Sequence, residues 1–484
     1  MYRNPSYTIQ VLAVLCIVAL LTTGWWYWGS FTTAALYFIF ICCAIIIFGL
    51  LIYAPRWYFF ALVGLIPISL DAALFGGAKL NLPSEGLLLG GILVWLYFNR
   101  SYHDGFRQVM RHPIVILFGL LFLTELFSGL LSNYIDVSLK RLFIHVLFFL
   151  GFFITLQSFR KSTDLHKPFL AYAIGLVPVM ILTLITHAHY NFAPQAVFSI
   201  CQPFYNDHTV YGACMAFILP LLFILIFRYR EMELSSRKRF WLLLLTLLII
   251  VSEVLALSRA ALLSLIVAGL FYLLLRYRVS FRNLLAGLGV LLAVVWFFSN
   301  DIYSAVERNE SVSNDGELVN HFSSVANVKN DASNLERINR WICAFRMFEE
   351  HPVLGFGPGT YQFEYNRYQT LSNKTYISTN LGDRGNAHSE YLAFLSESGI
   401  IGCILFLGIV LLSLYYGMQN HYSLEKGFLR RINLGVLLGL VSYYFHGIFN
   451  SFLDQSKLAF LFFAALGIIV WINLRLKNEA KEVV

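Results

Sequence analysis

Charged residues are scarce in this sequence of 484 residues. Asp, Glu, Lys and Arg together make up 13% of it, whereas hydrophobic residues make up 58% and aromatic residues 17%. Water-soluble domains contain about 25% charged residues, so the composition excludes a soluble enzyme. The apolar runs are roughly 17–25 residues long, which is the length of a helix that crosses a hydrocarbon core, and they lack the alternating polarity of outer-membrane strands.

Several enzyme motifs are also missing. The chain has no GxxxxGK[ST] phosphate loop, no HExxH zinc motif and no Asp-x-Asp pair. Their absence argues against nucleotide hydrolysis, zinc proteolysis and glycosyl transfer that depends on a metal held by paired aspartates. The 7 cysteines form no CxxC pair and have no metal-ligand spacing, so we interpret them as buried apolar residues and expect no metal site.

The apolar runs predict an all-α polytopic membrane protein with about 12–14 transmembrane helices. The predicted spans are 8–23, 32–53, 57–75, 84–98, 114–131, 142–157, 168–186, 209–227, 240–257, 260–275, 283–299, 391–415, 432–450 and 458–474. Lys and Arg concentrate in alternate connections, and the positive-inside rule places these connections and both termini in the cytoplasm. The first run lacks a small-residue cleavage site and is expected to stay as an anchor. Few residues separate the two spans around Arg259, so a re-entrant turn is an alternative there.

One long polar segment interrupts the apolar runs, and the topology puts it on the outer side of the membrane. We therefore divide the chain into an N-terminal transmembrane bundle (1–299), a large outer loop (300–389) and C-terminal transmembrane helices (390–484). Within the loop, apolar residues at helical spacing predict an amphipathic helix over about 334–349 that lies along the membrane surface. The residues of this apolar stripe are Ile338, Trp341, Ile342, Phe345 and Phe348.

Polar side chains near the outer face are the candidates for chemistry. Arg259 lies where a span meets this face, and a cation there suggests a functional partner, although snorkelling to the interface is the alternative. Arg337 and Arg340, three residues apart, share one side of the predicted helix, for which a solvated helix face is the alternative. His388 lies at the membrane mouth and has the chemistry of a general base, but histidines at interfaces are also common.

Four further residues are candidate substrate contacts. Asn206 and His208 end an outer loop that contains no Lys or Arg and that either binds a polar substrate or forms a plain turn. Glu390 and Tyr391 lie two and three residues after His388, and an ordinary interfacial position is the alternative for them.

The order of these motifs resembles the O-antigen ligase and O-antigen polymerase superfamily of bacterial envelope glycosyltransferases. The resemblance is strongest over about residues 200–410. It rests on Phe204-Tyr205-Asn206-Asp207-His208, Leu257-Ser258-Arg259-Ala260, Arg337-x-x-x-Trp341, His351-Pro352-x-Leu354-Gly355-x-Gly357-Pro358-Gly359, and Ala387-His388-Ser389-Glu390-Tyr391-Leu392 with Gly399-x-x-Gly402.

The resemblance implies an inner-membrane enzyme with a periplasmic active site that needs no metal, nucleotide or other cofactor. Its partners would be an undecaprenyl-diphosphate-linked glycan, a lipid A-core or other glycan acceptor and membrane lipids, without nucleic acid. It makes His388 the base and assigns the donor diphosphate to Arg259 and Arg337. Arg340 has no secure counterpart in the family and is a diphosphate candidate because it lies beside Arg337. Ser389 stands where many relatives have asparagine, so its role is open.

Ligase activity towards a lipid A-core hydroxyl is the function we favour, with inversion at the anomeric carbon. A polymerase that joins carrier-linked repeats and an O-linked protein glycosyltransferase are alternatives with the same chemistry. From another class, a polysaccharide transporter or flippase would explain the intramembrane carboxylates Asp71, Glu125 and Glu253, but the sequence lacks the repeated halves that transporters usually show. A non-catalytic envelope scaffold would leave the order of the Arg and His motifs unexplained.

Overall fold

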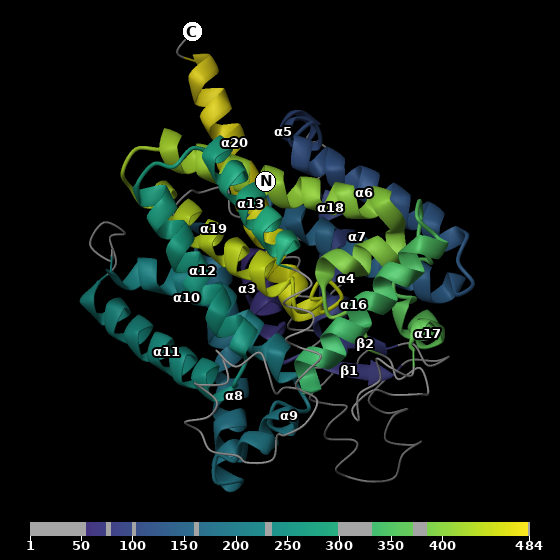
Figure 1. The fold of residues 1–484 in the computed structure, drawn as a ribbon. Coiled ribbons are helices and arrows are strands. Elements are labelled where there is room, and N and C mark those ends of the chain that lie inside the picture. The colour runs from purple at the N-terminus through teal and green to yellow at the C-terminus, as the bar shows by residue number, and fades with distance from the viewer. Residues whose placement is uncertain are drawn as a thin grey trace, which may run out of the picture. The chain divides into compact units, whose positions relative to one another are not determined.

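The computed structural model describes residues 55–73, 79–98, 103–158, 164–227, 235–298, 332–370 and 385–482 (Figure 1). The chain divides into two compact units, Met1–Leu62 and Val63–Val484. Most of the described structure is helical, and its two described strands, β1 (Leu70–Ala73) and β2 (Lys79–Leu82), form an antiparallel hairpin. The predicted all-α fold is thus confirmed.

The helices follow the apolar runs closely. In chain order they are α3 (Pro55–Leu65), α4 (Ser84–Phe98), α5 (His103–Met110), α6 (Pro113–Leu130), α7 (Ile135–Ser158), α8 (Lys167–His189), η3 (Pro194–Ala196), α9 (Val197–Ile200), α10 (His208–Phe227), α11 (Ser236–Leu255), α12 (Arg259–Arg276), α13 (Phe281–Phe297), α16 (Ala332–Glu350), α17 (Tyr361–Glu364), η5 (Tyr365–Tyr368), α18 (Glu390–Ser423), α19 (Phe428–His446) and α20 (Ser456–Glu482). The predicted spans 8–23 and 32–53 lie outside the described residues.

Six helices in the described ranges are long and apolar enough to cross a membrane, namely α6, α8, α10, α12, α18 and α20. This finding confirms a polytopic membrane protein. The single span predicted at 57–75 is wrong, because α3 ends at Leu65 and the chain then enters the hairpin, where Asp71 is the register partner of Asn81. Pro67 explains the early end, since proline disfavours the helical conformation of the residue before it.

Helices α10 and α19 pack closely and run in opposite directions. A Cβ atom on Gly435 would lie 2.6 Å from the Leu221 side chain, and one on Gly439 would lie 2.6 Å from the Phe217 carbonyl oxygen. Glycines four residues apart let helix backbones approach in this way. The two contacts also show that the helices are antiparallel, because the later glycine of α19 meets the earlier residue of α10. His446, at the end of α19, therefore lies near the beginning of α10.

Helix α12 packs against α19 with the same antiparallel relation. The hydroxyls of Ser264 and Ser442 are 2.7 Å apart. At the far end of α12, the Val279 carbonyl accepts a hydrogen bond of 3.0 Å from Tyr422, close to the point where α19 begins. Arg259 opens α12 five residues before Ser264. The beginnings of α10 and α12 and the end of α19 consequently meet at one end of the bundle.

Helix α18 is interrupted at Gly399, which has φ 65° and ψ −166°. The interruption leaves carbonyl groups without their usual helical donors. Two of them accept hydrogen bonds from a preceding segment: Phe356 N–H donates to Ser396 at 3.1 Å, and Gly357 N–H donates to Glu397 at 2.8 Å. We call this segment, residues 352–361, the glycine loop.

The Glu397 side chain fastens the glycine loop as well. Its carboxylate accepts the backbone N–H of Gly359 at 2.8 Å and that of Tyr361 at 3.0 Å. From α6, Ser128 donates to the carbonyls of Leu354 at 2.5 Å and Glu397 at 2.9 Å. The loop is thus held against α18 through both its backbone groups and the half-buried Glu397 carboxylate.

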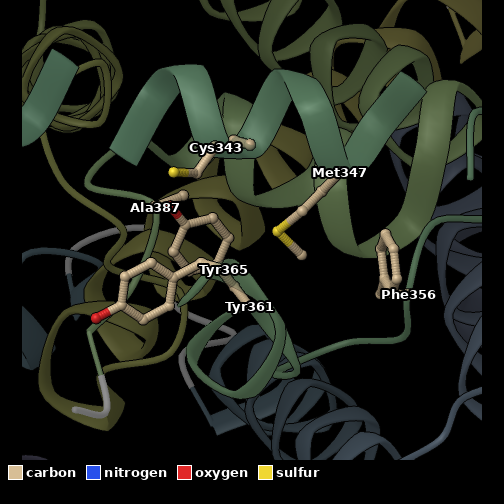
Figure 2. Packing of buried hydrophobic residues seen from close by; sticks show 7 residues of the cluster. Cys343, Met347, Phe356, Tyr361, Tyr365 and Ala387 are labelled. Carbon is tan, nitrogen blue, oxygen red and sulfur yellow. The ribbon is translucent and has the colours of Figure 1, made fainter. Parts of the chain in front are cut away.

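Helix α16 precedes the glycine loop and packs on α18. The apolar stripe expected on this helix is only partly covered by protein, and Phe345 is 50% exposed. The buried side instead carries Cys343 and Met347, which belong to a cluster shown in Figure 2. The other members of the cluster are Ala344, Phe356, Tyr361, Tyr365 and Ala387. This cluster joins α16 to the glycine loop and to the segment just before α18.

The glycine loop leads to a stability prediction. Gly355 has φ 67°, and a Cβ there would lie 2.4 Å from the Glu397 carbonyl carbon. We expect Gly355→Ala to lower the thermal unfolding midpoint in detergent, because the left-handed conformation alone costs roughly 1–2 kcal/mol in a residue with a side chain. Gly289→Ala in α13 is the control, since a Cβ there meets nothing within 4 Å. Equal midpoints for the two variants would contradict the packing described here.

Candidate functional site

His388 lies in the segment 385–389 that leads into α18. Its backbone φ is 46°, a left-handed conformation that side-chain-bearing residues rarely adopt. Two side chains hold it there: Asn386 Oδ1 accepts the His388 N–H at 3.0 Å, and Trp341 Nε1–H donates to the His388 carbonyl at 3.1 Å. Such strained residues cluster at functional sites. The Trp341 contact links the Arg337-x-x-x-Trp341 motif to the histidine motif.

The His388 ring is held in a form that can accept a proton. Its Nδ1 lies 3.3 Å from Asn450 Oδ1. An amide oxygen only accepts, so Nδ1 carries the proton in this pairing and Nε2 keeps its lone pair. Burial, followed by the positive charges of Arg340 and Arg337, lowers the pKa of His388 from 6.5 to about 4. The imidazole is therefore neutral at neutral pH, as a general base requires.

Arg340 is buried, with 6% of its surface exposed, so the alternative of a solvated helix face is wrong for this residue. Its Nε donates to Glu336 at 2.9 Å, and one terminal nitrogen donates to the Asn386 carbonyl at 3.2 Å. The guanidinium also lies over the Tyr365 ring, 5.0 Å from its centroid. These contacts tie α16 to the segment that carries His388. A diphosphate contact by Arg340 stays a prediction.

Arg337, one turn before Trp341 on α16, is half-buried. It interacts electrostatically with both His388 and His446. Asp207, immediately before α10, interacts with the same two histidines, while its carboxylate accepts the Thr209 N–H at 2.8 Å. Charged side chains of α16 and of the segment before α10 thus lie near both His388 and His446.

Arg259 is the first residue of α12 and is half-buried. The turn before it is tied to α10, because His208 Nδ1–H donates to the Ala256 carbonyl at 2.8 Å. Leu257, in the same turn, has φ 50° and is a second strained residue. The antiparallel packing of α12 and α19 places Arg259 and His446 at the same end of the bundle.

The other three candidate substrate contacts have partners within the protein. Asn206 Nδ2 donates to Asp71 at 3.0 Å. The Glu390 carboxylate is buried and accepts two backbone N–H groups of residues 452–453, at 2.5 Å and 3.1 Å. The Tyr391 hydroxyl donates to a carbonyl of α19 at 2.9 Å. Glu390 therefore positions the segment after α19, and substrate contacts by these residues remain predictions.

The sequence gives no functional indication for Asn450, and it favours a hydrogen-bonded residue of the helix bundle for His446. Both lie more than 50 residues beyond His388 and outside every motif of the resemblance. The signal that points to them is physical, since polar residues where an apolar span ends need hydrogen-bond partners. In the described part of the chain, no group of three or more His, Cys, Asp or Glu residues is arranged to hold a metal ion.

Comparison with known families identifies the middle of the chain. Residues 244–407 match the family model described as O-antigen ligase. The match includes Arg259, Arg337 and His388 and confirms the resemblance to this superfamily of glycosyltransferase-like ligases and polymerases, which use lipid-linked glycans and acceptors. No curated protein matches the chain. Asn206, His208, His446 and Asn450 lie outside the matched region.

The hydrogen bond from Trp341 to His388 can be tested by Trp341→Phe, which keeps an aromatic ring and removes the donor. One hydrogen bond is worth about 0.5–1.5 kcal/mol, so we expect glycosyl transfer to slow about two- to tenfold with little change in the thermal unfolding midpoint. Trp471→Phe on α20 is the control and should retain wild-type activity, because this ring contacts Arg475 rather than the site. Unchanged activity in the Trp341 variant would show that this hydrogen bond has no role in glycosyl transfer.

Proposed function

We propose that this chain, which carries an O-antigen ligase family region over residues 244–407, is an inverting glycosyltransferase. It moves a glycan from undecaprenyl diphosphate to a lipid A-core hydroxyl on the periplasmic face of the bacterial inner membrane, with both termini in the cytoplasm. The observation that carries the proposal is the His388 ring, held by Trp341 and Asn450 in a strained backbone beside the arginines of α16.

The arginines act on the donor. Negative charge grows on the diphosphate as the glycosyl bond breaks, and guanidinium groups stabilise it through paired hydrogen bonds. Arg337 and Arg259 bind the diphosphate from α16 and α12. Arg340 already donates to Glu336 and to the Asn386 carbonyl, so it contributes its positive charge to the diphosphate site.

His388 acts on the acceptor. The acceptor oxygen attacks C1 of the glycan while the bond from C1 to the phosphate oxygen breaks and leaves its electron pair on that oxygen. Nε2 of His388 takes the hydroxyl proton during the attack. The products are a glycosidic bond, undecaprenyl diphosphate and an imidazolium that returns its proton to solvent. Attack from the face opposite the diphosphate inverts the anomeric carbon.

The test is transfer in vitro by purified protein in EDTA without nucleotide. An undecaprenyl-diphosphate-linked glycan is offered with lipid A-core or, separately, with a second carrier-linked repeat. We expect product on lipid A-core and at least about a hundredfold loss in His388→Ala, because a positioned base contributes 10²- to 10⁴-fold. His189→Ala, at an exposed position ending α8, is the control and should behave as wild type.

The alternatives give distinct results in this assay. Chain growth on the second carrier-linked repeat would identify a polymerase with the same site. Absence of product with either acceptor, although the donor binds, would favour a protein acceptor. Full activity in His388→Ala would end the role of this histidine as the base.

The low pKa of His388 predicts how activity depends on pH. Transfer requires neutral imidazole and is lost as pH falls through the pKa. In the free enzyme this pKa is about 4, and bound diphosphate offsets the charges of Arg337 and Arg340, which raises it. The acid limb of kcat, which reports the substrate complex, should therefore lie at higher pH than that of kcat/KM. A kcat limb at the same or lower pH would contradict the placement of diphosphate near these arginines.

A further inference from the structure

Two polar side chains, Asn450 and His446, lead from His388 into the protein. His388 Nδ1 lies 3.3 Å from Asn450 Oδ1, and Asn450 Nδ2 lies 3.3 Å from His446 Nε2. Asn450 and His446 are 4% and 1% exposed. Both groups of the Asn450 amide are thus engaged, one with each histidine.

The two contacts determine each other. An Nδ2 group only donates, so His446 must present an unprotonated Nε2 to it. With its nitrogen facing His446, the Asn450 amide turns its oxygen towards His388. That oxygen selects the Nδ1–H form of the His388 ring and leaves Nε2 as the proton acceptor. A rotation of the amide would reverse both contacts and remove the base.

Asn450 is itself held in place by the residue two positions after His388. The Glu390 carboxylate binds the backbone N–H groups of residues 452–453, and the Glu390 N–H donates to the Gly447 carbonyl at 2.8 Å. The segment that contains Asn450 is therefore fixed on both sides to the beginning of α18. The spacing between His388 and Asn450 follows from these bonds.

We propose that Asn450 is a positioning residue that fixes the orientation and protonation form of the catalytic His388, with His446 holding the Asn450 amide. The inference rests on the proposed function, because it gives Asn450 a role only if His388 is the base. It adds a functional residue outside the region that matches the O-antigen ligase family.

The charges around His388 explain why a neutral partner suits it. Arg337 and Arg340 face the ring from α16, with Glu336 bonded to Arg340. Asp207 faces it from the beginning of α10, and the Glu390 carboxylate is occupied by backbone N–H groups. Asn450 orients the ring without adding a negative charge that would favour imidazolium.

The decisive variant is Asn450→Asp, which keeps an acceptor beside Nδ1 and adds a negative charge. A carboxylate within about 4–6 Å stabilises imidazolium and shifts a pKa by about 1–3 units. We expect the acid limb of kcat/KM in the lipid A-core transfer assay to move to higher pH by at least about one unit. This shift is measured on the active fraction, so a lower yield of folded protein leaves it readable.

Asn450→Leu gives an independent readout, since it keeps a similar volume and removes the acceptor. We expect kcat to fall more than tenfold with little change in the KM for the donor, because the ring loses its orientation while the arginines remain. Ser451→Ala is the matched control at a neighbouring buried position and should retain the wild-type pH profile and kcat.

The outcomes separate the inference from the proposed function. An unshifted acid limb in Asn450→Asp together with a normal kcat in Asn450→Leu would overturn the positioning role, even when His388→Ala is inactive. Full activity in His388→Ala would instead overturn the proposed base. A shifted limb and a lowered kcat with unchanged donor KM support the positioning role.

Discussion

The carbonyl groups that Gly399 frees in α18 need hydrogen-bond donors inside the protein, because lipid offers none. The glycine loop supplies these donors. In addition, the Glu397 carboxylate accepts two backbone N–H groups of the loop. The loop follows directly on α16, and α18 begins two residues after His388. The hydrogen bonds that satisfy the interrupted helix therefore fix α16, which carries Arg337, against the beginning of α18, two residues after His388. The relative positions of the other site residues depend on this contact.

The parts of the fold that depend on neighbouring residues in the sequence were predictable, and the parts that depend on contacts between distant residues were not. Span length and hydropathy are local, and they predicted α4, α6, α8 and α10 to within a few residues. The span at 57–75 failed because a sum of apolar residues ignores the stop at Pro67. The burial of Arg340 was hidden for another reason: Glu336 is a neighbour on the same helix, but the Asn386 carbonyl reaches Arg340 only when the chain folds.

The candidate site divides in the same way. Arg259, Arg337 and His388 stand in short motifs whose order along the chain resembles a family, so the sequence alone indicated them. Asn450 meets His388 across 62 residues, and nothing local distinguishes it from a residue that ends a span. Trp341 was visible as part of a motif, but its bond to the His388 carbonyl depends on how α16 sits on α18.

The bonds that Glu390 makes have a consequence for the reaction barrier. Because they join the first turn of α18 to the segment after α19, His388, Asn450 and His446 are held in one frame before any substrate arrives, which is the preorganisation that the proposed base needs. Aligning an imidazole during the reaction would add a reorganisation cost to every turnover, whereas dipoles fixed in advance do not. That alignment is completed once, when the chain folds, so under the proposed mechanism the glycan donor has only its own first sugar and diphosphate to orient.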